Sequence, residues 1–318
     1  MFYAIKTLIS AFIIVLVGEA SKRSNALAAL LLALPVVSVI AFIWRFVETG
    51  DKIKIAVRLW TLLLTFVVSL AHTAEVIPIE PIEKCFLCSS EPSQTMYWQG
   101  QGSKAVLMLI PGGEGHVGLK PGQTDHRYHQ FQTLRRLTDP SFTSGQFDVV
   151  LLDSPAPLSP NQRYPAARGG SEHMIRIESA IRFYKSRTGL PVWLMGHSNG
   201  GISLTEFLKY ARKNQRMDLI SGMVVSAVRN ESYFEAPVDF PMLFMHHQQD
   251  GCANTTHAAS LQNFEKVKTF ITAPVDFVTI QGGQAEPRDP CRSGFHMYFG
   301  AGEEVARQLD AFMSKAYK

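Results

Sequence analysis

Short apolar runs alternate with helical segments over most of this chain, and that alternation is the strongest constraint on its fold. The runs cover 105–110, 147–152, 192–195, 223–228, 242–245 and 275–280, and helical patterns begin at Ser171, 202 and 303. Several of the runs end directly at Gly, Pro or Asp. Strands bounded in this way and separated by helices predict an α/β fold, with a mostly parallel sheet covered by helices on both faces.

Residues 1–74 have a different composition, because three apolar stretches cover 2–17, 26–47 and 59–71. The second stretch is long enough to cross a bilayer as a helix, which takes about 20 residues. The third follows basic residues and precedes Ala71-His72-Thr73-Ala74, a pattern typical of a secretory signal peptide. The sequence predicts a membrane-directed segment of two to three apolar helices. The alternative is a pair of joined reading frames whose natural start lies further along the chain.

Charge is also distributed unevenly. Residues 1–74 hold 7 Lys and Arg against 3 Asp and Glu, which accounts for the net charge of +4, whereas residues 75–318 hold 24 of each sign. A neutral domain lacks the basic surface that binds nucleic acid, so we expect no nucleic-acid partner. The most basic loop of the first part is 45–58, and the positive-inside rule places it in the cytoplasm. Residues 75–318 are then predicted to lie outside the cytoplasm, in the periplasm if the source is bacterial.

The remaining segments complete the predicted domain organisation. In its apolar run 30–38 and in Trp44, the segment 1–55 resembles a family of small bacterial membrane proteins without assigned function. Residues 75–94 contain several prolines and are predicted to form an extended linker. Residues 95–318 are predicted to form one globular domain, since a stretch of this length can bury a sizeable core.

The run 192–195 leads into Gly196-His197-Ser198-Asn199-Gly200, which fits the pattern Gly-x-Ser-x-Gly. A strand before this pattern and a helix after it are the setting of a nucleophile elbow, a sharp turn that exposes a serine hydroxyl above the edge of a sheet. The glycines are needed because side chains on either side of the serine would clash in so tight a turn. The alternative is a glycine-rich helix start of a nucleotide-binding fold, whose characteristic motifs this turn does not match.

These residues resemble the α/β-hydrolase superfamily, and the resemblance covers about 95–318. In that family a serine, an acidic residue and a histidine follow one another along the chain. The resemblance implies Ser198 as nucleophile, Asp250 as the acid and His296 as the base, the last two each following one of the later apolar runs. The predicted fold is therefore an α/β-hydrolase fold, preceded by N-terminal membrane helices.

Each residue has an expected chemical task. A serine hydroxyl is a poor nucleophile at neutral pH, so His296 takes its proton and later passes it to the leaving group. Asp250 fixes the tautomer of His296 and stabilises the imidazolium that forms. The resemblance puts the two donors to the oxyanion at the backbone N–H groups of Asn199 and Gly113. Many relatives have His-Gly where this chain has Pro111-Gly112, just before Gly113.

Other assignments of these side chains stay open. Asp250 is also placed to be a turn residue before Gly251, and Asp153, after an earlier apolar run, is a rival for the acid. His246 and His247 form a candidate metal site with Asp250, but adjacent residues on a strand point to opposite faces. We expect no metal site and no organic cofactor.

Two of the four cysteines flank the predicted acid and base. Cys252 lies two residues after Asp250, and Cys291 lies five residues before His296. Because the loops that carry the acid and the base of a triad must lie side by side, we expect a Cys252–Cys291 disulfide, which also suits a compartment outside the cytoplasm. Cys85-Phe86-Leu87-Cys88 is a single C-x-x-C, for which we expect a local disulfide rather than zinc.

Together these features predict a serine hydrolase that acts through an acyl-enzyme on a small-molecule ester or another acyl substrate. An esterase is expected first, because no inserted cap domain is predicted, and a peptidase or a lipase of the same superfamily is the alternative. A non-catalytic binding protein with the hydrolase fold is the rival class. In each case residues 1–74 are expected to associate with a membrane.

Overall fold

The structure is a computed structural model, and it describes residues 74–83, 91–158, 167–235 and 237–317. The chain divides into two compact units, Met1–His72 and Thr73–Lys318, of which the second contains the described residues. The predicted membrane helices and the Cys85/Cys88 pair lie outside these residues. Within the described ranges, no helix is both long and apolar enough to cross a membrane.

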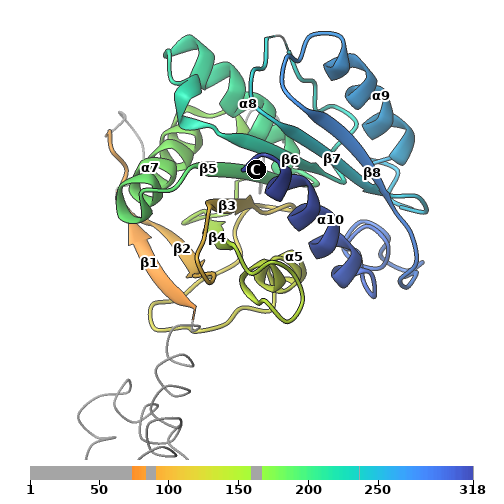
Figure 1. Ribbon diagram of the computed structural model, residues 1–318, viewed down its shortest axis with the longest axis horizontal. Helices are drawn as coiled ribbons and strands as arrows, with labels where there is room; N and C mark the ends of the chain where they lie inside the picture. The colour runs from red at the N-terminus through yellow and green to blue at the C-terminus, as the bar shows by residue number, and fades with distance from the viewer. Residues whose placement is uncertain (1–73, 84–90, 159–166, 236, 318) are drawn as a thin grey trace, which may run out of the picture. The chain divides into compact units, whose positions relative to one another are not determined.

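The centre of the domain is an eight-stranded sheet (Figure 1). Its strands are β1 (Glu75–Ile79), β2 (Ser93–Trp98), β3 (Ala105–Ile110), β4 (Phe147–Asp153), β5 (Val192–His197), β6 (Gly222–Ser226), β7 (Met242–His247) and β8 (Val275–Ile280). They lie in the order β1-β2-β4-β3-β5-β6-β7-β8. Strand β2 runs antiparallel to β1 and β4, and the other neighbouring strands are parallel. The predicted fold class, a mostly parallel sheet, is confirmed.

Helices cover both faces of this sheet. They are α5 (His129–Leu134), α7 (Ser171–Thr188), α8 (Gly200–Lys213), α9 (His257–Lys268) and α10 (Gly302–Lys315), with short 3-10 helices at Arg135–Thr138 and Met217–Leu219. One core holds side chains of α7, α8 and α9, and a second core holds side chains of α5 and α10. Because alternate residues of a strand point to opposite faces, β3 contributes Val106 and Met108 to the first core and Leu107 and Leu109 to the second.

The range 75–94, predicted as a linker, contains strands at both of its ends. Its first residues form β1, the edge strand of the sheet, and its last residues begin β2. Ile77 and Ile79 are buried in the core that α7 covers, so this segment belongs to the domain. Pro78 is tolerated because an edge strand pairs on one side only and can spare a backbone N–H. The apolar alternation around Pro78 was a strand signal that the neighbouring prolines obscured.

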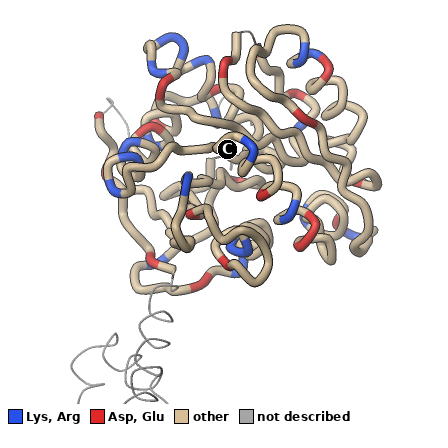
Figure 2. The backbone as a smooth tube through the Cα atoms, in the orientation of Figure 1, with Lys and Arg blue, Asp and Glu red and all other residues tan. Residues whose placement is uncertain are grey.

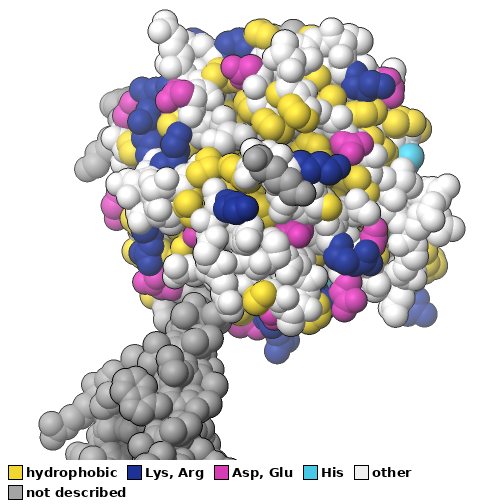
Figure 3. All heavy atoms as spheres, in the orientation of Figure 1, with side chains coloured by type: hydrophobic (Ala, Val, Ile, Leu, Met, Phe, Trp, Pro, Cys, Tyr) yellow, Lys and Arg dark blue, Asp and Glu magenta, His cyan; other side chains and the backbone are white. Residues whose placement is uncertain are grey.

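The surface of the domain agrees with its balanced charge. Lys and Arg are interspersed with Asp and Glu along the described chain (Figure 2). The face shown in Figure 3 mixes basic, acidic and apolar side chains.

The parallel strands bring their carboxyl ends to one edge of the sheet. Strands β5, β7 and β8 are followed at this edge by the segments that carry Ser198, Asp250 and His296.

Candidate active site

Ser198 lies in a tight turn between the end of β5 and the start of α8. Its backbone is in the left-handed region, with a φ of 54°, which is strained for a residue other than glycine. Its N–H donates to the carbonyl of Ser226 on β6 at 3.0 Å, which fixes the turn to the sheet. A Cβ at Gly200 would lie 2.2 Å from the carbonyl oxygen of Ile110, so the motif requires glycine there, as predicted. The turn therefore has the backbone of a nucleophile elbow.

The turn that follows β3 lies directly against Ser198. A Cβ at Gly112 would lie 3.0 Å from the Cβ of Ser198, so a side chain at this position would crowd the serine. Gly113 has a φ of 55°, and a Cβ built on it would meet no atom within 4 Å, so open space lies beside it. The carbonyl of Gly113 accepts a hydrogen bond from Nδ2 of Asn199 at 2.8 Å. The two residues predicted to bind an oxyanion are thus in contact, next to the serine.

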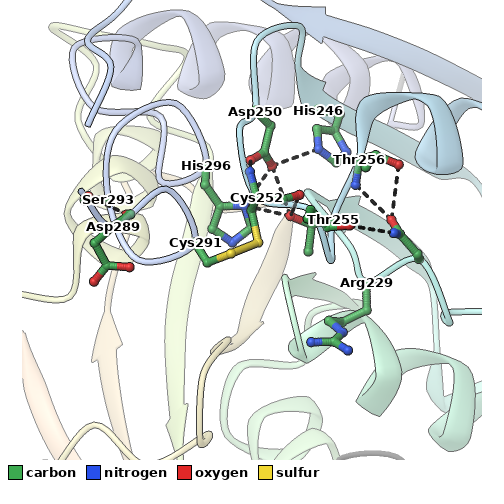
Figure 4. Close-up of a disulfide and its surroundings, with 12 residues drawn as sticks. Arg229, His246, Asp250, Cys252, Thr255, Thr256, Asp289, Cys291, Ser293 and His296 are labelled. Carbon is green, nitrogen blue, oxygen red and sulfur yellow. Dashed lines mark hydrogen bonds and ion pairs between the residues drawn. A yellow bond between two sulfur atoms is a disulfide. The ribbon is translucent and has the colours of Figure 1, made fainter. Parts of the chain in front are cut away.

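Asp250 and His296 meet on the loops that follow β7 and β8 (Figure 4). Nδ1 of His296 donates to Oδ2 of Asp250 at 2.7 Å, and both side chains are buried. The hydroxyl of Thr255 donates to the same oxygen at 3.2 Å, and the backbone N–H of Cys252 donates to Oδ1 at 2.9 Å. The structure therefore brings together the residues predicted as acid and base, with the carboxylate held on both oxygens.

A second histidine, His246 at the end of β7, contacts the same carboxylate (Figure 4). Its Nε2 lies 2.9 Å from Oδ2 of Asp250, and its side chain is fully buried. Burial raises the pKa of the Asp250 carboxyl, but hydrogen bonds from His246 and His296 outweigh burial and hold that pKa below its ordinary value. The carboxylate therefore stays ionised. Sequence reasoning considered His246 only as a metal ligand, and its spacing from Asp250 gave no sign of this contact.

His197 links the serine to the acid–base pair. Its ring centroid lies 5.0 Å from that of His296, so Ser198, the next residue along the chain, belongs to the same region as the acid–base pair. The side-chain amide of Gln130 donates to Nε2 of His197 at 3.1 Å, and Nδ1 of His197 lies 3.1 Å from Oγ of Ser226. Burial, together with the neighbouring ring of His296, lowers the pKa of His197 well below its ordinary value and keeps this ring neutral. His197 is therefore a buried packing residue between the elbow and His296.

The predicted disulfide is present. Cys252 and Cys291 are bonded, with their Cα atoms 4.6 Å apart (Figure 4). The bond ties the loop of Asp250 to the loop of His296, two segments that are far apart along the chain. It is a covalent link between the two loops that must be aligned if acid and base act together.

The side chains considered as an alternative acid or as metal ligands make other contacts. The carboxylate of Asp153, at the end of β4, accepts hydrogen bonds from two backbone N–H groups within 117–119, so it anchors that loop. Nε2 of His247 lies 2.7 Å from the carbonyl of Gly282, and this histidine does not share the partner of His246. Among the described residues, no group of three or more His, Cys, Asp or Glu side chains is placed to hold a metal ion.

The nucleotide-binding alternative has one further segment to consider. Residues 113–118 fit the pattern Gly-x-Gly-x-x-Gly and follow strand β3. A dinucleotide-binding turn leads directly into a helix, whose N-terminus receives the phosphates. Here the chain continues as a loop until α5 begins at His129, so this segment lacks the required setting.

Comparison with solved structures identifies the fold of the domain. A dienelactone hydrolase from Anabaena variabilis matches with a TM-score of 0.51 and 12% identity, over 77% of this chain and 98% of that chain. An esterase from Pyrobaculum calidifontis matches with a TM-score of 0.49 and 16% identity, over 79% and 89% of the two chains. Est1E from Butyrivibrio proteoclasticus, solved with ferulic acid, matches with a TM-score of 0.47 and 14% identity, over 72% of this chain and 97% of that chain. These proteins share a fold with this domain, and that conclusion rests on the match to the dienelactone hydrolase.

Comparisons of sequence concern mainly the N-terminal part. No curated protein matches the chain. Residues 1–78 match a protein family described as BV97_02767-like, so the family resemblance predicted for 1–55 is confirmed and extends across all three apolar stretches. The chain thus combines an N-terminal segment similar to BV97_02767-like proteins with a domain of the α/β-hydrolase fold.

Proposed function

We propose that this protein is a serine hydrolase that acts through an acyl-enzyme, with carboxylic esters as its substrates. The observation that carries the proposal is the hydrogen bond between Asp250 and His296 at the sheet edge that also carries the strained elbow of Ser198. Backbone strain and a buried, ionised carboxylate are features that gather at catalytic sites. The α/β-hydrolase fold supports the reaction class by analogy.

In this mechanism Oγ of Ser198 attacks the carbonyl carbon of the ester while Nε2 of His296 takes the hydroxyl proton. Asp250 accepts the Nδ1 hydrogen bond and stabilises the imidazolium. The carbonyl oxygen becomes an oxyanion that accepts hydrogen bonds from the backbone N–H groups of Gly113 and Asn199. His296 then protonates the leaving alcohol. A water molecule, activated by the same histidine, attacks the acyl-enzyme and releases the carboxylic acid.

Labelling with a fluorophosphonate probe tests this proposal on the full-length, oxidised chain. We expect the wild type to be labelled and Ser198→Ala to take no label, with hydrolysis of p-nitrophenyl acetate reduced by up to about 10⁶-fold. Ser293→Ala is the matched control, because this serine lies on the loop before His296 and its hydroxyl donates to the carbonyl of Asp289 (Figure 4). If the folded wild type takes no label, a non-catalytic binding role replaces the hydrolase proposal.

We also propose that the domain lies outside the cytoplasm and that residues 1–74 associate it with a membrane. The Cys252–Cys291 disulfide supports this location, since such bonds persist in oxidising compartments. Cells lysed directly into a maleimide-polyethylene-glycol reagent provide the test. We expect Cys252 and Cys291 to be modified only after reduction, whereas modification without a reductant would place the domain in a reducing compartment.

A further inference from the structure

Arg168, just before α7, is fully buried behind the turn that follows β3. Its Nη1 donates to the carbonyl of Pro111 at 3.0 Å. Its Nη2 donates to the carbonyls of Gly112 at 3.3 Å and Gly113 at 2.9 Å. A single guanidinium group therefore binds three consecutive carbonyls of the turn that lies against the elbow serine.

These carbonyls determine where the N–H groups of the turn point. In a trans peptide the C=O and the N–H that follows it point in opposite directions. Because the carbonyl of Gly112 points toward Arg168, the N–H of Gly113 points away from it. A charged donor on the carbonyl also polarises the peptide, which makes the N–H on its other side a stronger donor.

We propose that Arg168 is a positioning residue for the turn 111–113: it holds the turn through three carbonyls, aims the Gly113 N–H at the oxyanion and strengthens that N–H as a donor. The inference rests on the proposed hydrolase function, in which Gly113 supplies one of the two donors to the oxyanion. Arg168 acts through Gly113 and does not itself meet the substrate.

Two helices hold the guanidinium in place. Nη1 also donates to Oγ of Ser203 in α8 at 3.0 Å, and Oγ of Ser203 lies 2.9 Å from Nε2 of His173 in α7. Burial, with the charges of Arg168 and Arg176, lowers the pKa of His173 to about 3. His173 is therefore neutral, and its Nε2 shares a hydrogen bond with the hydroxyl of Ser203, whose oxygen also accepts the hydrogen bond from Nη1 of Arg168. That arrangement turns a lone pair of Ser203 toward Arg168.

The carbonyl of Gly113 connects the two donors of the proposed oxyanion site. The oxygen of Gly113 accepts from Nη2 of Arg168 at 2.9 Å and from Nδ2 of Asn199 at 2.8 Å. Since Asn199 supplies the other donor through its backbone, Arg168 and Asn199 together fix the distance between the two N–H groups. A planar guanidinium can bind several carbonyls at once, which an ammonium group cannot do with the same geometry.

The test compares Arg168→Met and Arg168→Lys with the wild type in full-length protein. We expect Arg168→Met to lower kcat for p-nitrophenyl acetate by about 10- to 100-fold with little change in KM, because one oxyanion donor is misplaced rather than removed. Binding of a boronic acid, which forms a tetrahedral adduct with the serine, should weaken by the same factor. Arg168→Lys should lose less. Arg176→Met is the matched control, since it removes a buried arginine that binds Glu172 and the carbonyl of Glu91.

A double-mutant cycle adds a measurement whose result would be unaffected if Arg168 had only a structural role. If Arg168 and Asn199 act through the same carbonyl, the losses in kcat for Arg168→Lys and Asn199→Ala should not be additive. The pH–rate profile of each variant should keep the wild-type acid limb, because neither change touches the acid–base pair. This cycle also carries the test if Arg168→Met does not fold.

Three results would overturn the inference. Wild-type kcat and boronate affinity in folded Arg168→Met, with Ser198 still labelled, would remove the role of Arg168 and leave the proposed function standing. An equal loss of kcat in Arg176→Met would show a general effect of losing a buried arginine. A folded wild type that takes no fluorophosphonate would end the proposed function, and the positioning role with it.

Discussion

The two halves of the proposed site are built in different ways. The half around Ser198 is shaped by close backbone contacts, since a Cβ at Gly200 would lie 2.2 Å from the carbonyl oxygen of Ile110. The half around Asp250 and His296 is shaped by side chains, through three hydrogen bonds to one carboxylate oxygen and a disulfide beside it. Steric contacts do not depend on pH or on redox conditions. Ion pairs, in contrast, depend on pH, and disulfides depend on redox conditions. The two halves should therefore fail under different conditions.

The largest effect is expected from Asp250→Asn, which disrupts only the acid–base half. The amide cannot hold His296 in the required tautomer or stabilise its protonated form, so kcat should fall by about 10⁴-fold while the fold is kept. Steady-state kinetics with p-nitrophenyl acetate and circular dichroism provide the measurement. Asp153→Asn is the matched control, a buried carboxylate at the end of β4 that should affect stability far more than kcat. Similar kcat values for the two variants would argue against Asp250 as the acid.

Removal of the disulfide is the next largest change and separates the two halves by redox state. Cys252 and Cys291 are 39 residues apart, and opening a loop of this length should lower the free energy of unfolding by about 4 kcal/mol. Urea denaturation of the Cys252→Ser/Cys291→Ser double variant measures this loss, and reduced wild type should match it. Reduction should leave the Ser198 turn intact. An unchanged unfolding midpoint would show that side-chain contacts alone align the two loops.

A methyl group at Gly200 tests the backbone half. Gly200→Ala places a carbon 2.2 Å from the Ile110 carbonyl, so the turn must shift, and we expect kcat to fall by about 100-fold in both oxidised and reduced protein. Gly251→Ala on the acid loop is the matched control, because its nearest neighbour would be Cβ of Pro290 at an ordinary 3.4 Å. If both alanine variants keep wild-type kcat, the steric account of the elbow is wrong.

The smallest effect at neutral pH, and one that grows on acidification, concerns the backbone half, where any pH-dependence would come from a side chain behind the turn. His173 braces Ser203 behind the turn, and its pKa lies near 3 when folded against 6.5 as the ordinary value. As pH falls through this range the unfolded chain binds the proton first, so stability present above pH 6.5 is lost on acidification. The free energy of unfolding should fall by up to about 1.4 kcal/mol more per pH unit than in His173→Gln. Parallel slopes for the two proteins would contradict a buried, neutral His173.

The sequence was enough to predict the elements that local pattern determines. Apolar runs marked β3 to β7, because strands buried on both faces are mostly apolar, and a mixed run that includes Asp276 marked the edge strand β8. The glycine spacing marked the elbow. Strand β1 was missed because Pro78 favours a linker until a partner strand is known. The contacts of His246 and Arg168 could not be predicted, because each depends on segments that only the folded chain brings together.

The close packing around the elbow also limits how such a chain can change over generations. Every glycine codon is a single base change from an alanine codon, so the mutation itself is readily available. At Gly200 the added methyl group would lie 2.2 Å from the carbonyl oxygen of Ile110, so this substitution needs a simultaneous shift of a neighbouring segment. At Gly112 it would lie 3.0 Å from Cβ of Ser198, a tight contact that Ser198 must relieve by a small displacement. The step at Gly200 is thus closed to the chain unless the ends of β3 and β5 move together. We expect drift among its descendants to accumulate on the exposed faces of the helices and to leave the contact between these two strand ends unchanged.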